Sequence, residues 1–219
     1  MKHRLLLLIA TASAALAACD KDPETATPTT PDASFLPLQT GNYWVYRQYR
    51  IDGRTGVATA TNILDSCFIS KDTLIRGQRY YKLVRPVLYS VIPDNRIVRD
   101  SLHYLVDHHG RRLFSSQDAT NILDTEYSTL NQAGRTDTVV RMVSRMMPQD
   151  TTISTAAGTF TVKKHRKTHI FYPSIFPGYQ PRVLHTRYAK DVGIVTEMLP
   201  FYAADPDYTE RRLIRYRVQ

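Results

Sequence analysis

Histidine side chains are the first candidates for chemistry in this sequence, because they bind metals and exchange protons near neutral pH. His165 and His169 lie four residues apart, the spacing that places two ligands on one face of a helix. The metalloprotease pattern also needs a glutamate directly after the first histidine, and Arg166 occupies that position. The segment reads as a strand, which would separate the two rings by about 13 Å, although His185 on the following strand could approach either ring. The His108-His109-Gly110 run is typical of an exposed turn. The sequence therefore predicts neither a metal site nor a cofactor.

No motif for nucleophilic catalysis or nucleotide binding occurs in the sequence. It lacks the G-x-S-x-G, S-x-x-K, G-x-x-x-x-G-K-[ST] and G-x-G-x-x-G patterns. Cys67 lies in an apolar, strand-like run over residues 63–69, and its nearest base in sequence, Lys71, is four residues away, so we expect a buried and unreactive thiol. The paired carboxylates of glycosidases leave no motif, because they are dispersed in sequence.

The sequence thus names no catalytic residue and favours a non-enzymatic binding or structural role. The alternative is a hydrolase that acts on glycans or lipids. Carboxylates or histidines clustered in a polar cleft would favour the hydrolase, whereas an apolar or empty concavity would favour binding.

The first nineteen residues have the pattern of a processing segment. Lys2, His3 and Arg4 precede an apolar run over residues 5–18, which is shorter than the roughly 20 residues that a membrane-spanning helix needs. The run ends in Leu16-Ala17-Ala18-Cys19, which resembles the lipobox of bacterial lipoproteins. The resemblance implies a signal peptide over residues 1–18, cleavage before Cys19, and a diacylglycerol and palmitate anchor on that cysteine.

Residues 19–34 are expected to form a lipidated, disordered tether. The stretch after Cys19 is rich in Pro and Thr and has no aromatic residue, so it cannot bury enough surface to fold. The acidic cluster over residues 20–24 resembles the signal that sends Bacteroidota lipoproteins to the cell surface. In enterobacterial sorting, Asp20 directly after the cysteine would instead indicate retention at the inner membrane. We expect an anchor in the outer membrane, at its periplasmic face or at the cell surface.

Alternation of apolar and polar residues predicts β-structure from residue 35 onward. Turn residues separate about ten predicted strands and indicate one all-β domain over residues 35–219, a single antiparallel curved sheet in the form of a half-barrel or a sandwich. One segment differs, because Ala119, Ile122, Leu123, Tyr127 and Leu130 recur at helical spacings and predict a short helix over residues 118–131. The predicted strands cover residues 43–51, 63–74, 79–84, 101–107, 111–114, 139–147, 159–171, 182–188, 193–199 and 208–218.

Several short sequence segments of the predicted domain resemble those of a family of uncharacterised Bacteroidota outer-membrane lipoproteins, and the resemblance covers most of residues 35–219. The segments over residues 157–160 and 188–195 are also similar to the half-barrel lipoproteins of the LolA/LolB type. The resemblance implies a curved antiparallel sheet and no catalytic residues. The matching segments lie at residues 36–38, 41–46, 99–102, 157–160, 188–195 and 210–216.

The chain is basic, with 29 Lys plus Arg against 20 Asp plus Glu and a formal net charge of +9. Nucleic acid is not an expected partner, because no recognition motif accompanies the charge. Anionic lipid headgroups, lipopolysaccharide or acidic glycans fit an envelope location better. The densest run, residues 163–167, would divide between the two faces of a strand, with Lys163, His165 and Lys167 on one side.

The loop over residues 171–181 is the most suggestive apolar feature, because three prolines exclude a central strand and four aromatic residues remain. An aromatic tip beside cationic strands would suit an amphiphile with an anionic head. The alternative is a lid that buries its own rings over the open end of the sheet. The candidate ligand contacts are Phe171, Tyr172, Phe176, Tyr179, Lys163, Lys167 and Arg182.

Overall fold

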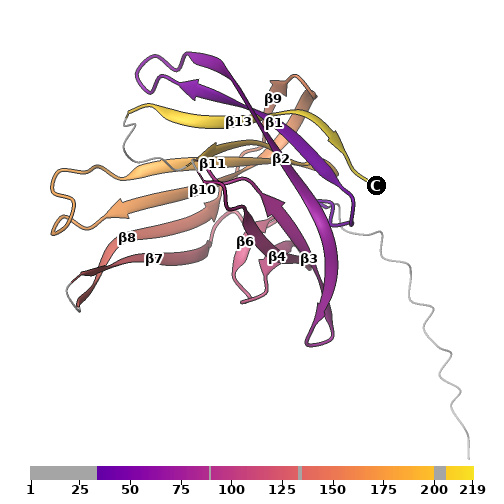
Figure 1. The fold of residues 1–219 in the computed structure, drawn as a ribbon, viewed down its shortest axis with the longest axis horizontal. Coiled ribbons are helices and arrows are strands. Elements are labelled where there is room, and N and C mark those ends of the chain that lie inside the picture. Colours follow the sequence, from indigo (N-terminus) through magenta and orange to yellow (C-terminus); the bar gives the residue numbers. More distant parts are fainter. Residues whose placement is uncertain (1–33, 89, 133–134, 200–205) are drawn as a thin grey trace, which may run out of the picture. The chain divides into compact units, whose positions relative to one another are not determined.

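The computed structural model describes residues 34–88, 90–132, 135–199 and 206–219, and Figure 1 shows their fold. The predicted signal peptide (1–18), the lipidation site Cys19 and all of the predicted tether except Ser34 lie outside these residues. In the part of the chain that the structure describes, no helix is long and apolar enough to cross a membrane.

All regular structure in the described residues is β-strand. The thirteen strands are β1 (Tyr43–Ile51), β2 (Ala58–Ile75), β3 (Gln78–Arg85), β4 (Asp94–Ser101), β5 (Tyr104–Asp107), β6 (Arg112–Ser115), β7 (Ile122–Gln132), β8 (Arg135–Met146), β9 (Thr151–Thr155), β10 (Gly158–Phe171), β11 (Arg182–Ala189), β12 (Gly193–Leu199) and β13 (Tyr208–Arg217).

The strands form one antiparallel sheet in the order β6-β5-β4-β3-β2-β1-β13-β12-β11-β10-β8-β7, and β9 pairs with β10. β1 lies between β2 and β13, so the first and last strands of the chain pair with each other. The end strands of the sheet, β6 and β7, contact each other. The guanidinium of Arg112 on β6 donates hydrogen bonds of 3.2 Å to the Ile122 and Leu123 carbonyls of β7. The sheet therefore curls into a nearly closed barrel (Figure 1).

The predicted all-β fold with one curved antiparallel sheet is confirmed, and it has thirteen strands rather than about ten. Two of the missed strands are β4 and β9, whose sequences are DNRIVRDS and TTIST. Both are dominated by charged or small polar residues, so neither shows the apolar alternation by which a half-buried strand is recognised.

The predicted helix over residues 118–131 is wrong, because residues 122–132 form strand β7. The pairing of β7 with β8 shifts between Ile122 and Asp124 and again between Ser128 and Thr129. Such shifts interrupt the period of two along a strand. Leu123 is buried at the first shift, whereas Ile122, Tyr127 and Leu130 are exposed. The spacings of three and four therefore do not mark one apolar face, as they would in a helix.

Large side chains of β1 and its neighbours fill one part of the barrel interior. Trp44 and Tyr46 are almost fully buried, and they donate hydrogen bonds to the carbonyls of Val192 and Ile194. Gly193 has φ +107°, and a Cβ there would lie 3.0 Å from the Trp44 Nε1, so glycine suits both the backbone and the packing. Cys67 is free and buried beside them, as predicted, and burial raises the pKa of its thiol.

The segment that precedes β1 packs against the barrel. The Asp191 amide donates a 2.7 Å hydrogen bond to the Ser34 carbonyl, and the Phe35 ring lies 5.2 Å from the Phe114 ring. Leu36 is buried in the core. This segment therefore contributes to the wall of the barrel interior.

Candidate functional site

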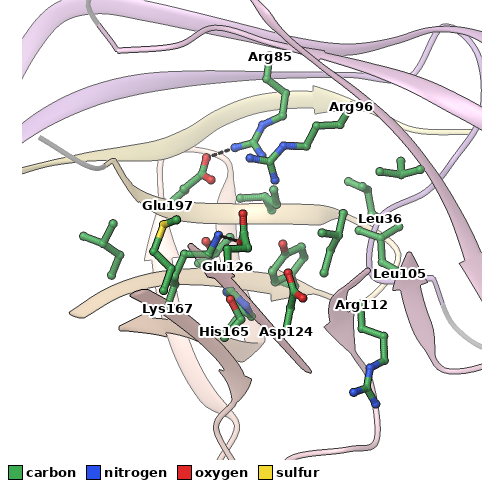
Figure 2. Close-up of a pocket in the computed structure, with 18 of the residues that line it drawn as sticks. Leu36, Arg85, Arg96, Leu105, Arg112, Asp124, Glu126, His165, Lys167 and Glu197 are labelled. Atoms are coloured by element: carbon green, nitrogen blue, oxygen red, sulfur yellow. Dashed lines mark hydrogen bonds and ion pairs between the residues drawn. The ribbon is translucent and has the colours of Figure 1, made fainter. Parts of the chain in front are cut away.

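A cavity of about 220 Å³ lies within the barrel (Figure 2). This interior cavity has the volume of about seven water molecules at about 30 Å³ each, so a ligand that fits it is small. Its wall is partly aliphatic, with Leu36, Leu83, Val98, Leu105, Leu113, Leu184 and Ile194 among the lining residues. Its polar lining residues are Arg85, Arg96, Arg112, Asp124, Glu126, Ser144, His165, Lys167, His169, Thr186, Tyr188 and Glu197.

Four charged side chains form a buried ion-pair network beside the cavity. Glu197 on β12 accepts a hydrogen bond from Arg85 on β3 (Figure 2). Arg211 on β13 lies between this carboxylate and Asp65 on β2, with Nε to oxygen distances of 3.6 and 3.5 Å. Burial alone would raise the pKa of Glu197, but Arg85 and Arg211 lower it to about 2. Glu197 is therefore charged at neutral pH, and a buried carboxylate of this kind needs a cation beside it.

A second set of charges comes from β7, from β10 and from the turn before β6. Lys167 donates a 2.6 Å hydrogen bond to Glu126, and Arg111 lies 3.1 Å from the other oxygen of the same carboxylate. Burial opposes ionisation of Glu126, but the hydrogen bond and charge of Lys167, together with Arg111, hold its pKa below the ordinary value. Glu126 is thus an ionised carboxylate that is held between the cations of Lys167 and Arg111.

Two polar atoms of the cavity wall are buried without a hydrogen-bond partner among the described residues. They are the Nε2 of His165 on β10 and the Oδ2 of Asp124 on β7. His165 is only 7% exposed. Burial lowers the pKa of His165 to about 4, Lys167 adds to this effect and Glu197 opposes it. At neutral pH, His165 is therefore uncharged and can act as one donor and one acceptor.

Arg96 extends the cationic part of the wall. Its Nε donates a 2.7 Å hydrogen bond to Asp94, and the side chain is 43% exposed. Figure 2 shows Arg85 and Arg96 entering the cavity from the same side. The charge of Arg96 contributes to the lowered pKa of Glu126, of Glu197 and of His165. Its guanidinium therefore acts on groups across the cavity.

The structure brings only one predicted ligand contact, Lys167, into the interior cavity. Lys163 shares the inward face of β10, as alternation predicts, but it lies 5.9 Å from the Phe35 ring and 3.2 Å from Asp150. Arg182 donates a hydrogen bond to the Asp207 carbonyl.

The predicted aromatic contacts gather in a separate cluster on the loop after β10. The rings of Phe171, Phe176 and Tyr179 lie between 5.3 and 5.6 Å from one another. Phe171 is buried against Val139 and Val140 of β8, whereas Tyr172 and Tyr179 are partly exposed. The loop thus buries part of its own aromatic surface, as a lid would, and leaves two rings accessible.

The histidines do not converge as metal ligands. His165 and His169 face the cavity, whereas His185 pairs with Arg166 on the outward side of β10 and β11. His108 and His109 lie in an exposed turn, as predicted. Within the described ranges, no three His, Cys, Asp or Glu side chains are grouped closely enough to hold a metal ion.

Most of the polar lining was not identified from the sequence. Asp124 and Glu126 lie in the segment that was expected to be helical, and alternation across β7 would have placed both on the inward face. Arg85, Glu197 and Arg211 carry no motif, because they come from three strands that meet only in the folded sheet. Only Glu197 has a sequence signal, as the one charged residue of the otherwise apolar β12, because β3 and β13 carry several charged residues each.

No protein-family model and no curated protein matches the sequence. Among solved structures, the chain is similar to a Bacteroides fragilis protein described as exported and as having a YmcC-like fold, with a TM-score of 0.50 and 15% identity over 84% of this chain and 99% of that chain. A Parabacteroides distasonis protein described as a lipoprotein matches with a TM-score of 0.42 and 11% identity over the same shares of the two chains. The first likeness shows that the chain shares the YmcC-like fold.

Proposed function

We propose that this protein is a lipid-anchored protein of the cell envelope whose interior cavity binds a small, hydroxylated anion without transforming it. The lipobox-like sequence ending in Cys19 supports the anchor. The likeness in fold to an exported Bacteroides protein is consistent with the envelope location. The anchor would hold the protein at the outer membrane, on its periplasmic face or at the cell surface.

The observation that carries the binding proposal is the pair of unpartnered atoms, His165 Nε2 and Asp124 Oδ2. A buried polar atom without a partner costs about 1–3 kcal/mol. Both atoms belong to residues of the same cavity wall, which is where a ligand could supply the missing hydrogen bonds. A hydroxyl group suits both positions, because it donates to the carboxylate and can donate to or accept from the imidazole.

The charge of the wall favours an anion. Four cations line the cavity, Arg85, Arg96, Arg112 and Lys167, against the three carboxylates of Asp124, Glu126 and Glu197. The side chain of Arg96 is more accessible than that of Arg85, with exposed fractions of 43% and 8%. Its guanidinium can pair with a carboxylate or phosphate oxygen of the ligand. The aliphatic part of the wall would contact the carbon skeleton of the ligand.

Hydrolysis is the less favoured function, although the cavity does contain carboxylates and histidines. A glycosidase needs a carboxylic acid that keeps its proton near neutral pH. The pKa of Glu197 is about 2 and that of Glu126 is also lowered, so neither can serve as that acid. Burial raises the pKa of Asp100 to about 6, but Asp100 does not line this cavity.

Calorimetric titration of the full chain with D-glucuronate, D-glucose and hexanoate tests the proposal. We expect D-glucuronate to bind most tightly, because it carries both hydroxyl groups and a carboxylate. Replacing His165 with phenylalanine should weaken glucuronate binding about tenfold, the equivalent of one hydrogen bond. The control His185→Phe alters a histidine of the neighbouring strand that faces outward, and it should leave binding unchanged.

Equal weakening by His165→Phe and His185→Phe would contradict binding in the interior cavity. Release of nitrophenol from a nitrophenyl glucuronide, abolished by Asp124→Asn, would replace the binding proposal with the hydrolase.

The anchor has its own test. Cells that express the full chain and are fed radioactive palmitate should label the protein, and Cys19→Ala should abolish the label, because no other lipobox-like cysteine occurs in the sequence. Cys67→Ala is the matched control and should retain the label. Labelling that persists in Cys19→Ala would contradict the anchor while leaving the cavity proposal intact.

A further inference from the structure

The basic run on β10 divides between the inside and the outside of the barrel. Lys167 and His165 line the interior cavity, so the alternation of a strand directs Lys164 and Arg166 outward. The run by itself therefore supplies only two outward cations. The outward half of the run, however, has cationic neighbours on the adjoining strands.

Register places these cations directly beside one another. Arg166 pairs with Arg145 on β8 and with His185 on β11. Lys164 pairs with Arg187 on β11. Residues that oppose one another in this way have Cβ atoms about 5 Å apart, and like charges at that distance repel. Two outward positions further along β8, beyond Val143, Arg141 is also outward and exposed. We call Arg141, Arg145, Lys164 and Arg166 the basic outer face.

The basic outer face has little compensating negative charge. Arg187 pairs with Glu210 at 3.2 Å, but none of the ion pairs among the described residues includes a member of the basic outer face. The Arg166 Nε and the His185 Nδ1 are buried and have no hydrogen-bond partner in the same part of the chain. The fold thus tolerates a cluster of like charges that its own acids do not neutralise.

The surroundings of this face are partly apolar. Ile122 and Tyr127 of β7 pair with Arg145 and Arg141 and are exposed. Cationic side chains beside exposed aliphatic and aromatic groups match the interface of an anionic membrane, where the cations meet phosphates and the aromatic groups lie at the level of the headgroups.

We propose that the basic outer face docks the barrel on anionic phospholipid headgroups of the membrane. The expected anchor at Cys19 would already hold the barrel near such a surface. The fully extended length of the fifteen residues that follow it is at most about 50 Å. The proposal does not depend on the ligand of the interior cavity, since the two sites use opposite faces of β8 and β10.

A fluorophore on Thr168→Cys tests the docking. Thr168 lies outward between Val143 and Val183, next to the Arg145–Arg166 row. The labelled chain also carries Cys19→Ala, which removes both the second thiol and the anchor, and Cys67 is buried and should not react. The labelled full chain is mixed with phosphatidylcholine vesicles that contain a headgroup-linked quencher, with or without phosphatidylglycerol. We expect quenching only with phosphatidylglycerol, and its loss at high salt. A label on Ser66→Cys, on the exposed face of β2, should remain unquenched.

The double variant Arg145→Gln/Arg166→Gln should reduce the quenching at residue 168 to the level of neutral vesicles. Its melting temperature should be unchanged or higher, because the substitutions remove like-charge repulsion. The control Arg47→Gln/Arg215→Gln removes the same charge from exposed positions on β1 and β13 and should retain quenching. Equal quenching of the labels at residues 66 and 168, or binding to polygalacturonate without quenching by anionic vesicles, would overturn the proposal.

Discussion

Replacing Arg211 with alanine should lower the free energy of unfolding by about 3–5 kcal/mol. Arg211 is 2% exposed and lies 3.5 and 3.6 Å from the carboxylates of Asp65 and Glu197. It also donates a 3.1 Å hydrogen bond to the Pro86 carbonyl. Its removal leaves Asp65 without a cation, because Arg85 pairs with Glu197. An uncompensated charge in a buried position is what makes the loss large.

Urea denaturation followed by tryptophan fluorescence measures this effect, because Trp44 is the single tryptophan and is buried in the core. The matched control is Arg215→Ala on the same strand, which is exposed and should change stability by no more than about 0.5 kcal/mol. A similar, small loss for both variants would show that the buried ion-pair network does not hold the strands together.

Acidification should destabilise the protein through His165 by about 2 kcal/mol between pH 8 and pH 5. The pKa of His165 is about 4 in the folded chain and about 6.5 when unfolded. Between these values the unfolded chain binds a proton that the folded chain does not. The stability contributed by neutral His165 is therefore complete above pH 6.5 and is lost as the pH falls towards 4.

The measurement compares the chain with His165→Phe in urea at both pH values. The variant should show a drop in stability about 2 kcal/mol smaller, whereas His108→Phe, in an exposed turn, should match the unaltered chain. The comparison of variants matters because other groups titrate in the same range. His169 and His185 also have pKa values of about 4, while Asp100, with a pKa of about 6, changes stability in the opposite direction. An identical drop in all three proteins would contradict a buried, neutral His165.

The β-architecture is readable from local pattern, and the errors occur where that pattern is interrupted. β1 shows the period of two in the buried Trp44 and Tyr46 and the exposed Tyr43 and Arg47, although its pairing with β13 shifts at Val45, which is also buried. β7, whose pairing with β8 shifts twice, shows no such alternation of apolar residues. A single sequence shows the spacing of the apolar residues, but a bulge is defined by the pairing with a partner strand, which the sequence does not show.

The interior cavity was beyond prediction for a related reason. Lys167 could be placed on one face of β10, but its partner Glu126 lies 41 residues earlier, and Arg85 meets Glu197 across 112 residues. Which inward side chains meet depends on the sheet order, and that order depends on β1 pairing with β13. Alternation therefore identifies the inward face of each strand, whereas the composition of the cavity requires the closed arrangement of all of them.

A crystal structure of the full chain grown in D-glucuronate would test the proposed ligand site most directly. We predict that the sugar occupies the interior cavity, with one hydroxyl within hydrogen-bond distance of His165 Nε2, another at Asp124 Oδ2, and the carboxylate at Arg96. Ordered water alone at these atoms, with the sugar absent or bound only on the outside of the barrel, would contradict the proposed function.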